Sequence, residues 1–82
     1  MKASEQAAAL IEEHVRAWMA ALEQEPTDAD VYCEAIEQAR CEEASGWQTI
    51  GAPCFAAITF GRTSPVHYAR IVTRRIRPEA GV

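Results

Sequence analysis

The sequence predicts an α+β domain in which two N-terminal antiparallel helices pack on a small antiparallel sheet, either a β-hairpin or three strands. Residues 1–45 show apolar side chains at a helical period, whereas residues 46–77 alternate glycine or proline turns with β-branched and aromatic segments. A chain of 82 residues is long enough for one hydrophobic core, so we expect residues 1–82 to form a single domain.

The first predicted element is an amphipathic helix over residues 4–24. Ser4 is a suitable N-cap, and Pro26 prevents the helix from continuing. At about 100° per residue, apolar side chains fall on one side of this helix. They are Ala7, Ile11, Val15, Trp18 and Leu22. The opposite side carries Glu5, Glu12, Glu13, Arg16 and Glu23. We therefore expect the outer face of this helix to be acidic.

A second helix is predicted over residues 28–45. Thr27 is its expected N-cap and Gly46 its expected end. Its apolar side is thin and consists mostly of small residues. The members of that side are Ala29, Tyr32, Cys33, Ile36 and Ala39. Small residues allow close approach of a second helix, so residues 4–24 and 28–45 are expected to form an antiparallel hairpin.

The β-rich part is predicted over residues 47–77, followed by a flexible tail at 78–82. Residues 47–50 and 54–60 have the length and composition of strands. Val66, Ile71, Val72, Thr73 and Ile76 are β-branched, which favours a third strand after the turn at 61–65.

A helix over residues 65–77 is the alternative for this last segment. Ser64 would be its N-cap and Pro65 its first residue, which is a common way for a helix to begin. This alternative would make the protein mostly α-helical.

Charge is distributed unevenly along the chain. Residues 1–45 carry eleven acidic and three basic side chains, whereas residues 46–82 carry five arginines and one glutamate. The net charges of the two halves are therefore −8 and +4, within a total of −4. A surface of one sign selects partners of the other sign, so the charge pattern predicts binding more directly than it predicts chemistry.

We expect a small, acidic, non-enzymatic protein-binding module that presents an acidic helical face to a basic partner surface. The carboxylates expected to form that face are Glu12, Glu13, Glu23, Glu34, Glu37 and Glu42. Such a module would act as an inhibitor or regulator, as phage anti-defence proteins of similar size and charge can. This comparison is an analogy of size and charge alone.

The arginine segment of residues 70–77 offers an alternative function. It contains Arg70, Arg74, Arg75 and Arg77. Arginine binds phosphates and carboxylates through paired hydrogen bonds, so nucleic acid is one possible partner. The acidic half of the chain would repel a phosphate backbone, which makes nucleic acid the less favoured partner. These arginines would otherwise pair with the acidic helices of the same chain or of a neighbouring one.

No motif indicates a cofactor, a metal site or a catalytic centre. Cys33 and Cys41 are eight residues apart on a predicted helix, about 12 Å along its axis, too far for a tight zinc-binding pair. Cys33 is expected to be a small core residue and Cys41 a partly exposed thiol. Cys54 and His67 fall far apart in the predicted hairpin and do not form a nucleophile pair. The absence of such motifs does not exclude an enzyme, so a small enzyme or enzyme subunit is kept as the second alternative to a protein-binding function.

Composition also bears on assembly and location. The core is thin because many of its apolar residues are alanine, so a homodimer is expected. Three cysteines without a secretory signal favour a cytoplasmic protein, and no apolar run is long enough to cross a membrane.

Overall fold

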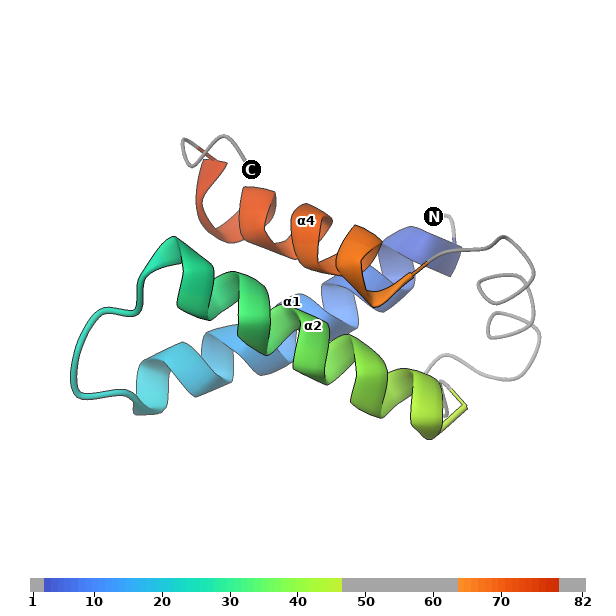
Figure 1. The fold of residues 1–82 in the computed structure, drawn as a ribbon, viewed down its shortest axis with the longest axis horizontal. Coiled ribbons are helices and arrows are strands. Elements are labelled where there is room, and N and C mark those ends of the chain that lie inside the picture. The colour runs from blue at the N-terminus through green and yellow to red at the C-terminus, as the bar shows by residue number, and fades with distance from the viewer. Residues whose placement is uncertain (1–2, 47–63, 79–82) are drawn as a thin grey trace.

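A computed structural model of the chain describes residues 3–46 and 64–78. These residues form the helices α1 (Ala3–Ala21), α2 (Asp28–Ala44) and α4 (Pro65–Ile76), shown in Figure 1. Within these two ranges there is no strand, so the predicted α+β class is wrong and the described part of the protein is helical. The strands expected at 47–50 and 54–60, and most of the expected tail, lie outside the described residues.

The segment expected to be a third strand is the helix α4. Its start follows the alternative prediction, since Ser64 is the N-cap, its hydroxyl accepts a hydrogen bond from the His67 amide at 3.4 Å, and Pro65 is the first residue. The β-branched Val72 and Thr73 are both fully buried. A β-branched residue loses less than about 0.7 kcal/mol of helix propensity relative to alanine, and this loss is smaller than the gain from burying such a side chain.

Thr73 shows how α4 accepts a polar residue in its buried face. Its hydroxyl donates a hydrogen bond of 2.7 Å to the carbonyl of Ala69, one turn earlier in the same helix. The hydroxyl is therefore satisfied without a partner from another element.

The helices α1 and α2 begin and end close to the predicted residues. Thr27 and Asp30 form a capping box at the start of α2, in which the Thr27 hydroxyl accepts from the Asp30 amide and the Asp30 carboxylate accepts from the Thr27 amide. At the other end Gly46 has a φ of 70°, a conformation that glycine adopts readily. The helix α1 ends at Ala21, three residues earlier than predicted, so residues 22–27 connect it to α2.

Each of the three described helices contacts the other two. The arrangement differs from the predicted one, in which α1 and α2 form a closely packed hairpin. Figure 1 shows α1 and α2 crossing and separating toward their connection. Of the helix pairs, α2 and α4 make the most extensive contact and α1 and α2 the least. The helix α4 therefore closes the core that α1 and α2 leave incomplete.

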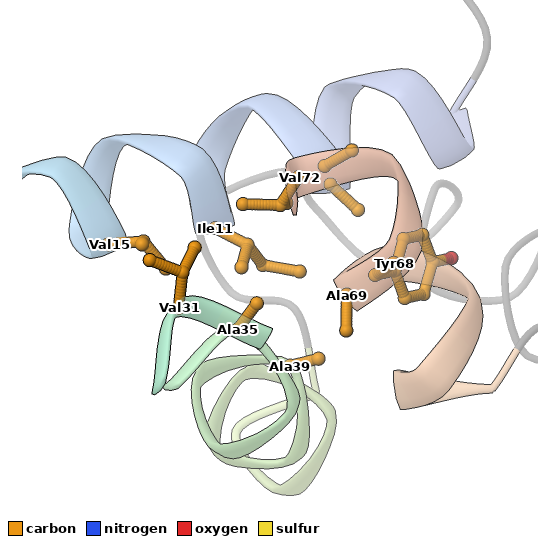
Figure 2. Close-up of a cluster of buried hydrophobic side chains, with 10 residues drawn as sticks. Ile11, Val15, Val31, Ala35, Ala39, Tyr68, Ala69 and Val72 are labelled. Carbon is orange, nitrogen blue, oxygen red and sulfur yellow. The ribbon is translucent and has the colours of Figure 1, made fainter. Parts of the chain in front are cut away.

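The core lies between these helices and is rich in alanine (Figure 2). Its fully buried apolar residues are Ala7, Ala8, Ile11, Val15, Val31, Ala35, Ala39, Tyr68, Ala69 and Val72. Half of these ten are alanine, which keeps the helix backbones close together and leaves room for Tyr68, the largest fully buried side chain.

Two expectations about the core need correction. The buried side of α2 is formed by Val31, Ala35 and Ala39, whereas Cys33 is exposed. Tyr32 and Ile36, which were predicted to lie on the apolar side, are only partly buried. The buried side of α2 is therefore rotated about the helix axis from the predicted one. Tyr32 and Ile36 lie at the edge of the core instead of at its centre.

The alanine at the centre of α2 can be tested by enlarging it. We expect Ala35→Leu to lower the free energy of unfolding by about 1–3 kcal/mol, because the added atoms have no space among buried neighbours. The matched control Ala44→Leu changes an exposed alanine of the same helix and should leave the free energy of unfolding within about 0.5 kcal/mol of the wild type. Urea denaturation measures both. Equal effects of the two substitutions would contradict the close packing.

Candidate interaction surface

Arg77, directly after α4, joins that helix to the connection between α1 and α2. Its Nη2 atom donates hydrogen bonds of 2.7 Å to the Glu25 carboxylate and 2.7 Å to the Pro26 carbonyl. Its Nε atom lies 2.9 Å from a carboxylate oxygen of Asp28 in an ion pair whose angles do not meet those of a hydrogen bond. The side chain is 24% exposed, so this cluster is partly shielded from water.

A second ion-pair cluster joins α1 and α4 around Glu12. One carboxylate oxygen of Glu12 is 3.0 Å from Arg16 Nε on the same helix, and the other is 3.5 Å from Arg75 Nη1 on α4. The Glu12 side chain is half-buried, with 22% of its surface exposed. Glu12 therefore holds two helices together and is not free for a partner.

Two further carboxylates from the predicted acidic face are also half-buried. Glu42 of α2 lies 3.8 Å from Nε2 of His14 on α1, at the contact between these helices. Glu34 accepts a hydrogen bond of 3.0 Å from the Gln38 side chain one turn later. Half of the six carboxylates predicted for the acidic face are thus engaged within the chain.

The other three predicted carboxylates are exposed and lie on different elements. Glu13 is on α1, Glu23 is in the connection between α1 and α2, and Glu37 is on α2. None of them forms an ion pair within residues 3–46 and 64–78. Glu13, Glu23 and Glu37 are therefore exposed, unlike the half-buried Glu12, Glu34 and Glu42.

The second half of α2 contains one further exposed carboxylate besides the six predicted site residues. Glu43 is exposed in the last turn of the helix, which contains no basic residue. A carboxylate at the C-terminal end of a helix is destabilised by the partial negative charge of the last carbonyl groups.

The helix α2 as a whole is strongly acidic. It carries six carboxylates against one cation, Arg40. Arg40 is three residues from both Glu37 and Glu43, but it forms an ion pair with neither of them. These three side chains therefore remain exposed and available for contact.

The arginine segment is divided between two environments. Arg75 and Arg77 contact carboxylates of other elements, as described above, whereas Arg70 and Arg74 are exposed on α4. Arg75 and Arg77 thus help to hold the described helices together. The partners of Arg77 are Glu25 and Asp28, which were not predicted as site residues. Only the fold brings these two carboxylates near Arg77.

The described residues contain no obvious centre for metal or thiol chemistry. No group of three histidine, cysteine or acidic side chains in residues 3–46 and 64–78 is arranged to hold a metal ion. Cys33 and Cys41 are both free thiols exposed on α2. Cys54, which the sequence analysis considered as a nucleophile paired with His67, lies outside the described residues. Within the same ranges no helix is long and apolar enough to cross a membrane.

Comparison with protein-family models, curated proteins and solved structures finds no match for this chain.

The role of Arg77 can be tested by removing its charge. We expect Arg77→Gln to lower the free energy of unfolding by about 1–2 kcal/mol, because its hydrogen bonds to Glu25 and Pro26 are lost but the Glu25 carboxylate remains hydrated. The control Arg70→Gln removes an exposed arginine of the same segment and should change stability by less than about 0.5 kcal/mol. Urea denaturation distinguishes them. Indistinguishable stabilities of the two variants would contradict a structural role for Arg77.

The capping box predicts a pH dependence centred on Asp30. The hydrogen bonds from the Thr27 amide and hydroxyl lower the pKa of the Asp30 carboxyl below its ordinary value of 3.8. The ionised carboxylate therefore stabilises the folded state above the unfolded pKa, and this contribution is lost as the pH falls through the lower folded pKa. We expect Asp30→Asn to be less stable than the wild type at neutral pH and to approach it at about pH 2. Urea denaturation at both pH values measures this, and an unchanged difference would contradict the assignment.

Proposed function

We propose that this protein is a small protein-binding module that acts as an inhibitor or regulator by presenting exposed carboxylates of α2 to a basic surface of another protein. The observation that supports this proposal most directly is the position of Glu43. It is exposed at the negative end of α2, without a cation, where it opposes helix stability.

The charge of Glu43 is not compensated by an ion pair within residues 3–46 and 64–78. A carboxylate in the last turn of a helix costs about 0.3–1 kcal/mol of stability when it is exposed. Glu42, its neighbour, lies 3.8 Å from Nε2 of His14, whereas Glu43 has no basic side chain within ion-pair distance in residues 3–46 and 64–78. A basic partner would offset the cost at Glu43 and would also meet Glu37, which is exposed on the same helix.

The internal ion pairs weaken the case for the nucleic-acid alternative. Arg75 and Arg77 are occupied by Glu12, Glu25 and Asp28, so a phosphate backbone would have to compete with carboxylates already in place. Residues 3–46 carry eleven carboxylates and two arginines, which would repel the same backbone. A protein with a basic surface fits this charge distribution better.

The proposal predicts that stability and binding change in opposite directions. Glu43→Gln should raise the free energy of unfolding by about 0.3–1 kcal/mol. Combined with Glu37→Gln, it should weaken binding to the partner about tenfold, the equivalent of about 1.4 kcal/mol. The partner is first isolated by affinity capture and purified, and its Kd is then measured by calorimetry.

The matched control is Glu5→Gln, which neutralises an exposed carboxylate in the first turn of α1. Near the positive end of a helix a carboxylate is stabilising, so this variant should lose stability and keep its Kd. Equal weakening of binding by Glu5→Gln would indicate a general effect of net charge and would contradict the proposed surface. Binding of duplex DNA or RNA that weakens steeply with added salt would favour the nucleic-acid alternative instead.

A further inference from the structure

Four exposed residues follow one line along the outward side of α1, and no ion pair or hydrogen bond within residues 3–46 and 64–78 joins them to another element. Ala9, Glu13, Arg16 and Ala20 are all exposed, whereas Ile11 and Val15 of the same helix are fully buried. The exposed four are separated by four, three and four residues. This alternation is the spacing of the contact positions in a coiled coil, so the four side chains form one seam along the helix.

This seam is complementary to itself when two copies run in opposite directions. If the twofold axis passes between residues 14 and 15, Glu13 of one copy faces the partner's Arg16, and Ala9 faces the partner's Ala20. The symmetry repeats each contact, so two opposite-charge pairs lie next to the axis and an alanine pair lies beyond each of them.

The charges also exclude the parallel arrangement. In a parallel pair Glu13 would face the partner's Glu13, and Arg16 would face the partner's Arg16. Like charges held directly opposite each other are unfavourable, whereas the antiparallel pair places opposite charges together. The alanines at both ends allow the helix backbones to approach closely, which shortens the charge contacts and restricts access of water.

Arg16 can reach a second copy without leaving a carboxylate unpaired. In the isolated chain its Nε atom contacts Glu12 at 3.0 Å, but the other oxygen of Glu12 is also paired with Arg75 of α4. The Arg16 side chain is 54% exposed, so its guanidinium is accessible from outside. Glu13 has no ion pair within the described ranges and would gain one.

We propose that α1 mediates a twofold-symmetric, antiparallel homodimer through Ala9, Glu13, Arg16 and Ala20. A second copy of the chain is the occupant because the seam supplies both members of each ion pair. The dimer does not use the α2 carboxylates of the proposed function, so each inference can fail without the other. Association also adds buried surface to a protein whose own core is half alanine.

The test uses reciprocal charge reversals and sedimentation equilibrium over a concentration series. The wild type should form a reversible dimer whose mass approaches twice the 9.0 kDa of the chain. Glu13→Arg places two cations opposite each other, and Arg16→Glu places two anions opposite each other, so each variant alone should dimerise at least about tenfold more weakly. An equimolar mixture of the two variants should recover association, because every pair across that heterodimer is again of opposite charge. The doubly reversed variant E13R/R16E should also dimerise.

The control Glu5→Arg reverses an exposed charge one turn before Ala9, where the facing position of the second copy lies beyond the end of α1, and should leave dimerisation unchanged. Circular dichroism of each variant, together with recovery in the mixture, separates loss of the interface from loss of folding. A wild-type chain that is monomeric throughout the series overturns the proposal. Single variants that dimerise as well as the wild type also overturn it, as does a mixture of folded variants that fails to associate.

Discussion

Burial of the apolar face of α4 is the interaction on which the rest of the structure depends. The helices α1 and α2 cross and separate, so they cover little of each other's apolar surface (Figure 1). Tyr68 and Val72 of α4 belong to the same buried cluster as Ile11 of α1 and Ala35 of α2 (Figure 2). Without α4, the core would lose Tyr68, Ala69 and Val72, which are three of its ten fully buried apolar residues.

The position of α4 also determines which charges remain on the surface. Once its apolar face is buried, its last residues lie beside the connection between α1 and α2 and beside the middle of α1. Arg77 and Arg75 then pair with carboxylates that would otherwise be exposed. Carboxylates that lie away from these arginines, such as Glu37 and Glu43 of α2 and Glu13 of α1, remain exposed.

Local signals along the chain predicted the start of each helix where a cap is present. Thr27 and Ser64 both act as N-caps, and Gly46 ends α2 in the conformation expected of it. The prediction of a strand for residues 66–77 was wrong because β-branched residues have only a small intrinsic preference for the β conformation. Burial against two helices outweighs this preference. The buried side of α2 was also misjudged, because small side chains such as Ala35 give a weak periodic signal.

The sequence by itself determined the caps at Thr27 and Ser64, the acidic composition of the first half and the arginine content of the second. These properties are local or additive, so they do not depend on how the chain folds. The predicted N-cap Ser4 was wrong, because α1 already begins at Ala3. Only the tertiary structure decided which carboxylates are engaged and which are exposed. Glu12 and Glu13 are adjacent in the sequence, but Glu12 faces α4 and contacts Arg75, whereas Glu13 points outward. Their difference arises because successive residues of a helix are turned by about 100° and only one of the two meets a neighbouring element.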